Sequence, residues 1–136
     1  MNNISSYPLV SVIVNCHNGE VFLKDCINSI INQTYKNWEL IFWDNCSSDK
    51  SKEILESYSE KRIKYFRAEK FTTLYEARNL ALKKASGDYI SFLDTDDWWS
   101  ANKIEKQLDL FNTNRKLDVV YTSFYIYRQR KKTKKK

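Results

Sequence analysis

Three aspartates stand within four positions at the end of a short apolar run. Residues 89–93 (YISFL) favour β-structure and predict a buried strand, which Asp94, Asp96 and Asp97 follow directly. Carboxylates this close raise one another's pKa unless a positive charge lies among them. A turn or a helix cap accounts for one aspartate more readily than for three. Oxygen ligands suit a hard divalent cation, so the segment predicts a Mg²⁺ or Mn²⁺ site.

Two other polar segments also follow predicted strands. Asn15 begins one of them, after the apolar run at 9–14 (LVSVIV), and Asp44 begins the second, after the run at 39–43 (ELIFW). In an open parallel sheet, ligands bind outside the carboxyl ends of the strands. We therefore expect these two segments and the aspartate cluster to meet in one crevice.

The elements that would position these residues alternate along the chain. Helical patterns, with apolar residues three or four positions apart, separate the predicted strands. The strands are predicted at 9–14, 39–43, 63–66, 89–93 and 118–125. This alternation predicts an α/β fold with a mostly parallel, Rossmann-like sheet and helices on both faces.

Capping residues indicate where these helices begin and end. Thr73 and Glu76 have the spacing of a capping box. Gly87 is expected in the left-handed conformation that commonly follows a helix. Serines that can cap the second and fourth helices are Ser47 or Ser48 and Ser100, respectively.

Composition and charge describe one folded unit with a basic end. Hydrophobic residues make up 42% of the 136 residues and aromatic residues 15%, as in a globular domain. The net charge of +6 comes from residues 128–136, which hold seven basic residues and no acidic one, so residues 1–127 carry −1. We predict a domain at 1–127, a disordered tail at 128–136, and no specific nucleic-acid partner.

Cysteine, histidine and glycine usage excludes several other classes. The three cysteines contain no Cys-x-x-Cys pair, and one histidine adds no credible zinc set, so reduced thiols in a cytoplasmic protein are expected. No apolar run approaches the length of a membrane span, and residues 1–6 do not form a signal peptide. Two glycines cannot supply a P-loop or a Gly-x-Gly-x-x-Gly motif, so a bound phosphate would need a metal and side chains.

The order of the motifs resembles one known family. The segments are VSVIVN (10–15), QTY (33–35), WELI (38–41), DNCSSD (44–49), ARN (77–79), ASGDY (85–89) and DTDD (94–97). Together they are similar to the N-terminal, nucleotide-sugar-binding half of family 2 glycosyltransferases with the GT-A fold. The resemblance extends from about Pro8 to about Tyr125.

The resemblance implies transfer of a sugar from a nucleotide-diphosphate sugar, UDP-linked, to a glycan or lipid-linked acceptor. It implies a metal-dependent, inverting reaction in cell-envelope polysaccharide synthesis, at the inner face of the membrane. The residues it assigns to the donor are Asn15 and Asp44 near the base and ribose, Arg78 near the base or diphosphate, and Asp94 near the ribose or metal. It assigns Mn²⁺ or Mg²⁺ to Asp96 or Asp97, where the metal neutralises the leaving diphosphate.

The chain also departs from the family pattern. Asn45-Cys46 stands where Asp-Gly is common. The family's acceptor half, which supplies the carboxylate base of inverting members, has no counterpart after Tyr125, so no catalytic residue is assigned. We expect this chain to be the donor-binding part, with a homo-oligomer or a complementing chain as partner.

Several alternatives remain open on the sequence. The domain could bind a nucleotide or nucleotide sugar without turnover, and the basic tail could bind a membrane surface peripherally. Trp98 and Trp99 could stack on a base or sugar, or cover the core. His17 is expected to make a loop hydrogen bond, and Arg78 could instead pair with a nearby glutamate.

Overall fold

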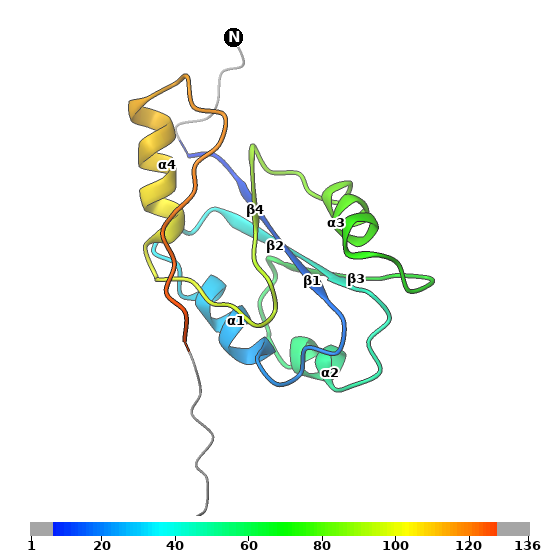
Figure 1. Ribbon diagram of the computed structural model, residues 1–136. Helices are drawn as coiled ribbons and strands as arrows, with labels where there is room; N and C mark the ends of the chain where they lie inside the picture. The colour runs from blue at the N-terminus through cyan, green and yellow to red at the C-terminus, as the bar shows by residue number, and fades with distance from the viewer. Residues whose placement is uncertain (1–6, 128–136) are drawn as a thin grey trace, which may run out of the picture.

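The computed structural model describes residues 7–127, which form four strands and four helices in alternation (Figure 1). The strands are β1 (Val10–Cys16), β2 (Trp38–Asp44), β3 (Ile63–Arg67) and β4 (Tyr89–Phe92). The helices are α1 (Leu23–Ile31), α2 (Ser51–Glu56), α3 (Leu74–Leu82) and α4 (Lys103–Thr113). The first four predicted strands are confirmed, each within a few residues.

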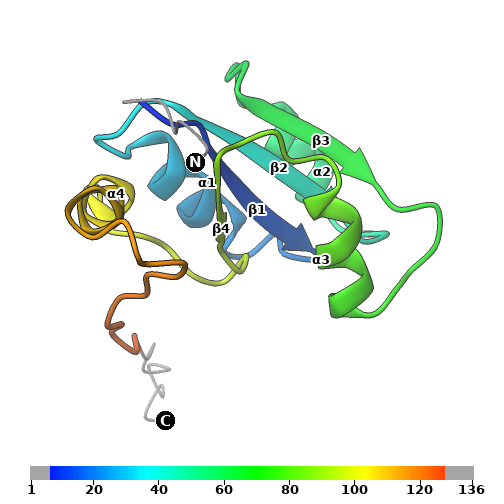
Figure 2. The same ribbon diagram turned by 90° about the horizontal axis from the view of Figure 1, so that it is seen from above.

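The strands form one sheet in the order β3-β2-β1-β4, and every pairing within residues 7–127 is parallel. From β1 the chain moves outward to β2 and β3, then returns to place β4 on the other side of β1 (Figure 2). The strand order therefore reverses between β1 and β4, which is where open α/β sheets bind ligands.

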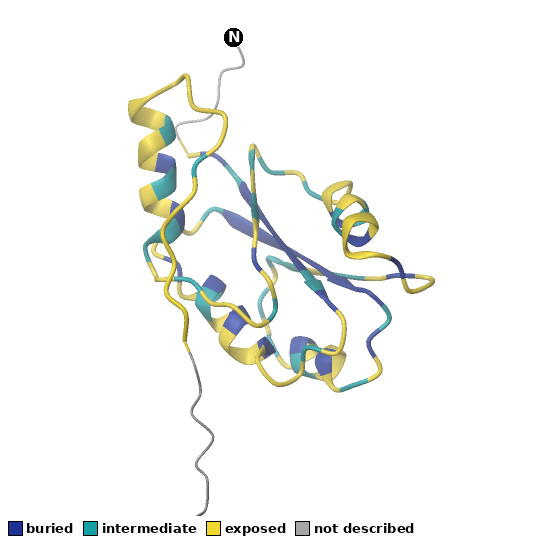
Figure 3. Cartoon of the chain, in the orientation of Figure 1, coloured by how far each residue is buried: buried dark blue, intermediate teal, exposed yellow. Residues whose placement is uncertain are grey.

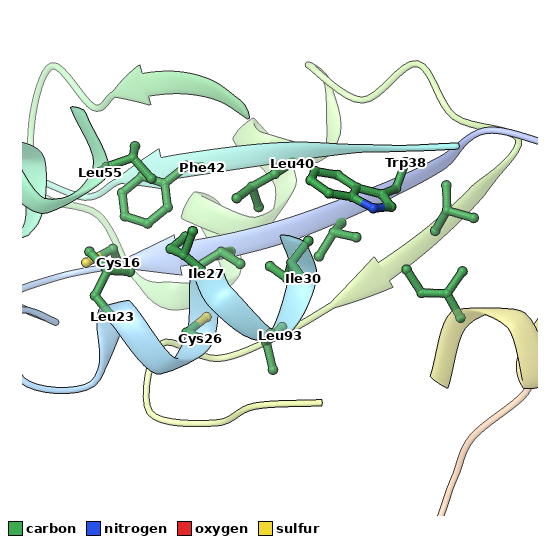
Figure 4. Packing of buried hydrophobic residues seen from close by; sticks show 14 of the residues in the cluster. Cys16, Leu23, Cys26, Ile27, Ile30, Trp38, Leu40, Phe42, Leu55 and Leu93 are labelled. Carbon is green, nitrogen blue, oxygen red and sulfur yellow. The ribbon is translucent and has the colours of Figure 1, made fainter. Parts of the chain in front are cut away.

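Helices cover both faces of the sheet, because side chains alternate between the faces along each strand. On one face Val12, Leu40 and Phe42 pack against α1, α2 and α4, and Figure 4 shows side chains of α1 pointing at the sheet. On the other face Ile41 and Trp43 pack against α3. Figure 3 shows the resulting buried band along β1 and β2, and the predicted α/β fold class is confirmed.

Two predicted helix starts are wrong, because the serines expected to cap these helices do not precede them directly. α2 begins at Ser51, not after Ser47 or Ser48. The Ser47 hydroxyl oxygen instead accepts the Asn18 backbone N–H at 3.0 Å. α4 is preceded by Asn102 rather than capped by Ser100. The capping box of Thr73 and Glu76 at the start of α3 is confirmed.

Gly87 does not adopt the left-handed conformation, so that prediction is wrong. A Cβ at position 87 would lie 2.6 Å from the backbone nitrogen of Ser11, which shows that the glycine permits close approach to β1. Left-handed backbone occurs instead at Asn18, with φ of 55°, and at Cys46, with φ of 62°.

Residues 118–125 form no strand, contrary to the prediction. Tyr121 is 89% exposed and Phe124 81% exposed, so the run of β-formers has no sheet neighbour in the described part of the chain. The predicted basic tail at 128–136 lies outside the described residues. No helix within residues 7–127 is long and apolar enough to cross a membrane.

Candidate functional site

The three polar segments predicted to meet do lie together at the carboxyl edge of the sheet. The backbone N–H of Asn45, after β2, donates to the Cys16 carbonyl at 2.7 Å, which joins the ends of β1 and β2. The Cys26 thiol contacts the Asp94 carbonyl at 3.7 Å, which places the segment after β4 against α1. One edge therefore brings these segments together beside the reversal in strand order.

Asp44 is fully buried at the end of β2. Its carboxylate accepts hydrogen bonds from the Ser47 backbone at 2.7 Å, the Tyr65 hydroxyl at 2.7 Å and the Arg67 guanidinium at 2.5 Å. Since a carboxylate offers about four acceptor positions, one remains for a ligand donor. Because the side chain is buried, a ligand reaches that position only when a covering side chain moves.

Sequence reasoning missed Tyr65 and Arg67. They stand two positions apart on β3, so their side chains leave the same face of the strand and both reach Asp44. Arg67 also donates to the Ser47 carbonyl at 3.0 Å and balances the charge of Asp44. The sequence signal that could have found them is the spacing of two positions in a strand, which puts both side chains on one face, next to an aspartate.

Asn15 lies beside a pocket of about 200 Å³ at the end of β1. Its amide nitrogen is buried and has no hydrogen-bond partner among the described residues, so a donor remains for a ligand carbonyl. The His17 ring packs against Phe71 with centroids 4.7 Å apart, and its Nδ1 lies 2.9 Å from the Asn45 carbonyl oxygen. The predicted loop hydrogen bond of His17 is thus confirmed.

Asn45 ties the same edge to α3. Its amide nitrogen donates to the Thr72 carbonyl at 2.8 Å, and its amide oxygen accepts from the Thr72 backbone N–H at 3.1 Å. An aspartate could not make this pair of bonds, because it has no donor when ionised. Asn45 therefore fixes the residue before the Thr73 cap and, through the helix, the position of Arg78.

Arg78 and Asp94 form an ion pair, with Nη2 and Oδ1 2.8 Å apart. The partner of Arg78 is therefore the aspartate at the end of β4 rather than a glutamate of its own helix. Both side chains are partly open to solvent, so the pair contributes little to stability. An incoming anion can compete for Arg78, and an incoming cation can compete for Asp94.

Asp96 and Asp97 are exposed in the turn after β4, where the Asp97 backbone N–H donates to the Asp94 carbonyl at 3.1 Å. Burial raises the pKa of the Asp97 carboxyl, and the charges of Asp96 and Asp94 raise it further. Within residues 7–127 no three His, Cys, Asp or Glu side chains converge as a metal site. This donor set fits an ion that takes one or two carboxylates and most other ligands from substrate phosphates.

The cysteines take no part in this chemistry. Cys16 and Cys26 are buried, while Cys46 is half-buried, and none of the three forms a disulfide. Burial raises the pKa of the Cys26 thiol to about 12, so the thiol is protonated at neutral pH.

A parallel α/β sheet with carboxylates, an arginine and an unpaired amide at its switch point defines a nucleotide-binding domain of the Rossmann-like class. The family model described as "Glycosyl transferase family 2" matches residues 11–136. The chain therefore belongs to glycosyl transferase family 2 and corresponds to the N-terminal half of a GT-A enzyme.

Relatives and solved structures agree with this family. The UDP-Glc:alpha-D-GlcNAc-diphosphoundecaprenol beta-1,3-glucosyltransferase WfgD of Escherichia coli is 41% identical over 118 residues, covering 87% of this chain and 46% of WfgD. WfaP of Escherichia coli, named for the same reaction, is 36% identical over 118 residues, covering 87% of this chain and 47% of WfaP. The chain spans about half the length of the curated relatives it matches.

Among solved structures, Staphylococcus aureus TarS 1–349 in complex with UDP-GlcNAc superposes with a TM-score of 0.75 at 28% identity, over 78% of this chain and 32% of TarS. The mannosyltransferase PcManGT from Pyrobaculum calidifontis shares the fold, with a TM-score of 0.72 at 20% identity, over 80% of this chain and 35% of PcManGT.

Proposed function

We propose that this chain is the donor-binding part of a glycosyltransferase that moves a sugar from a UDP-linked donor to a glycan or lipid-linked acceptor. The observation that carries the proposal is the meeting of Asn15, Asp44, Arg78 and the Asp94–Asp97 segment at the switch point of the sheet. WfgD is named for a UDP-Glc donor, and TarS has been solved in complex with UDP-GlcNAc; both support a uridine donor. The reaction is proposed to take place in the cytoplasm, at the inner face of the membrane, as a step of cell-envelope polysaccharide synthesis.

The base and ribose are proposed to bind between β1 and β2. Asn15 offers a buried, unpaired amide donor to a base carbonyl, and Asp44 offers one free acceptor position to an N–H or a ribose hydroxyl. Because Tyr65 and Arg67 hold the Asp44 carboxylate in place, this acceptor is already oriented before the ligand arrives.

The diphosphate is proposed to bind at Arg78 and the aspartate segment. It gives Arg78 a second anionic partner, which frees Asp94 from its ion pair. Asp96 or Asp97 would hold Mn²⁺ or Mg²⁺, which supplies charge neutralisation on the leaving diphosphate when bound. Burial raises the pKa of Asp97 most, and a cation at this position would offset the smaller part that comes from the charges of Asp96 and Asp94.

The transfer is proposed to invert the anomeric centre, as the family resemblance implies. The base that deprotonates the acceptor is not assigned within residues 7–127. A homo-oligomer or a complementing chain is also proposed as a partner. Domain boundaries at 1–127 and 128–136, and peripheral membrane binding through the basic end, remain proposals.

Calorimetric titration of UDP, with and without Mn²⁺, tests the donor site directly. We expect binding that requires Mn²⁺ and is lost in Asp96→Ala. Asp109→Ala is the matched control, because Asp109 is an exposed aspartate of α4 outside the site. Equal binding by both variants, or binding indifferent to Mn²⁺, contradicts the metal assignment.

Donor hydrolysis by the same samples separates the two functional classes. UDP-sugar hydrolysis or transfer supports an enzyme. Tight, metal-dependent binding without any turnover supports the alternative of a nucleotide-sugar-binding module. Absence of UDP binding under every condition refutes both.

A further inference from the structure

We propose that a groove between α1 and the residues following β4 binds a saccharide and holds the acceptor sugar; this inference rests on the proposed function. The groove, called here the α1–Trp98 groove, has a volume of about 540 Å³, which is within the usual range of ligand pockets. It is lined by Asp25, Asn28, Ser29, Asn32, Trp98, Trp99, Ala101 and Tyr127. None of these residues belongs to the proposed donor site.

One wall of the groove is aromatic. Trp98 is 53% exposed, and its ring meets Tyr127 edge-on with centroids 5.8 Å apart. Trp99 packs on the core while the Lys103 ammonium lies 4.2 Å from its ring centroid. Neither indole N–H has a hydrogen-bond partner in residues 7–127, so both rings combine an apolar face with a free donor. Such rings suit ligands that are apolar on one side and polar at the edge, as pyranose sugars are.

The opposite wall is polar and belongs to α1. Asp25, Asn28 and Asn32 are spaced by three and four residues, so they share one face of the helix and its end. The Asn28 amide oxygen accepts from the Tyr58 hydroxyl at 3.1 Å, which leaves its N–H₂ free. In the part of the chain described, the side chains of Asp25 and Asn32 have no hydrogen-bond partner. Free carboxylate and amide groups match the donors and acceptors of sugar hydroxyls.

The charge of the groove favours a neutral sugar over a phosphate. Its lining contains one carboxylate, Asp25, and neither lysine nor arginine. A diphosphate or a nucleic-acid backbone would meet the Asp25 carboxylate there, while the nearby Lys103 ammonium is already held over the Trp99 ring. The same reasoning places the donor diphosphate elsewhere, at Arg78 and the metal.

The groove lies next to the proposed donor site. Cys26, the neighbour of Asp25 on α1, contacts the Asp94 carbonyl at 3.7 Å, and Trp98 follows Asp97 directly. In Figure 1 the segment after β4 passes α1 on its way to α4. A saccharide in the groove would therefore have one end beside the metal-binding segment, where the donor sugar is transferred.

Indole N–H resonances in ¹H–¹⁵N NMR spectra give a direct test with internal controls. The chain has four tryptophans, of which Trp98 and Trp99 line the groove while Trp38 and Trp43 are buried in the core. The probe is methyl α-N-acetylglucosaminide, with mannitol as a matched polyol that lacks a ring face. We expect saturable shifts of the Trp98 and Trp99 signals with the glycoside, and unmoved signals from Trp38 and Trp43.

Variants then assign the binding to the groove. Trp98→Ala is expected to weaken glycoside binding roughly tenfold, through loss of aromatic stacking. Asn32→Ala is expected to weaken it as well, and it leaves the core intact because Asn32 is exposed. Tyr75→Ala removes an aromatic ring that is 78% exposed on α3, and is expected to bind like the wild type.

Titration of UDP and Mn²⁺ into the same samples separates this inference from the proposed function. UDP binding that is equal in wild type and Trp98→Ala, together with groove shifts on adding the glycoside, supports the acceptor assignment. UDP binding without any shift of Trp98 or Trp99 overturns it and leaves the donor site standing. Glycoside binding in a protein that does not bind UDP, or equal shifts with mannitol, also overturns it.

Discussion

Glu39 joins four segments of the fold through one buried carboxylate, and its removal gives the sharpest test of the structure. One carboxylate oxygen accepts from the Ser11 hydroxyl at 2.5 Å and the Ser86 backbone N–H at 2.7 Å. The other accepts from the Lys64 ammonium at 2.6 Å. β1, β2, β3 and the loop before β4 therefore depend on the same charge.

The magnitude follows from the pKa of Glu39. Burial acts to raise this pKa, but the hydrogen bonds from Lys64, Ser11 and Ser86 outweigh it and lower the pKa from 4.5 to about 2. A shift of that size corresponds to roughly 3 kcal/mol of folding free energy at neutral pH. In Glu39→Gln the amide nitrogen meets a donor in either orientation, the Lys64 ammonium or the Ser86 backbone N–H. We expect a loss of about 3 kcal/mol and a fall in Tm on the order of 10 °C.

Urea unfolding at several pH values measures this loss. Because the folded-state pKa is lowered, the contribution of Glu39 is present above its unfolded pKa of 4.5 and is lost as pH falls toward 2. The stability difference between wild type and Glu39→Gln is therefore expected to shrink over that range. Glu56→Gln is the control, since Glu56 pairs with Lys52 in solvent at 3.6 Å and contributes little. A Glu39→Gln loss under about 1 kcal/mol at pH 7, or one independent of pH, refutes the reasoning.

Three further changes test local features. Gly87→Ala is expected to cost about 1–3 kcal/mol in thermal unfolding, because the new Cβ would meet Ser11; unchanged stability would show that this approach is looser. In urea unfolding, Cys46→Gly is expected to be about 1 kcal/mol more stable than Cys46→Ala, because alanine keeps the steric penalty of the left-handed backbone at φ 62°. Equal free energies of unfolding would show that the backbone at position 46 is not strained. Tyr65→Phe is expected to lower the free energy of unfolding by about 2 kcal/mol and to weaken UDP binding in calorimetry, because Asp44 loses a hydrogen-bond donor. An unaltered UDP affinity would show that Tyr65 does not orient Asp44 for the ligand.

The sequence predicted the elements whose own residues determine them. Runs such as 40–43 (LIFW) are apolar throughout because both faces of the strand are covered, and such runs are recognised without knowing their neighbours. The capping box at Thr73 is equally local, since both of its hydrogen bonds close within three residues. The predictions failed where a distant partner decides. Ser47 caps no helix because its hydroxyl oxygen accepts the distant Asn18 backbone N–H instead.

Residues 118–125 are another case in which a distant partner decides the structure. A run of β-formers predicts a strand, but a strand also needs a neighbour with free backbone groups, and the sequence does not state where one is. Gly87 is a second example: its need for glycine comes from β1, far away along the chain, rather than from its own backbone angles. Both errors concern contacts between segments that propensity does not describe.

The site was predictable in position but not in its pairings. The aspartates, Asn15 and Arg78 could be placed at one edge because strand ends converge in a parallel sheet. Arg67 and Arg78, however, pair with different carboxylates, and the sequence does not reveal which arginine pairs with which aspartate. Arg67 neutralises the buried Asp44, which keeps one acceptor position for a ligand, whereas Arg78 holds Asp94 in solvent.

This division assigns different work to the two kinds of aspartate. A buried, fully oriented carboxylate such as Asp44 loses little freedom when a ligand donor arrives, so it suits recognition of a base or ribose. Exposed carboxylates such as Asp96 and Asp97 repel one another and gain most from a cation, so they suit a metal that arrives with the diphosphate. Recognition is thus built before binding, while the charge balance at Asp94–Asp97 is completed only by the donor itself.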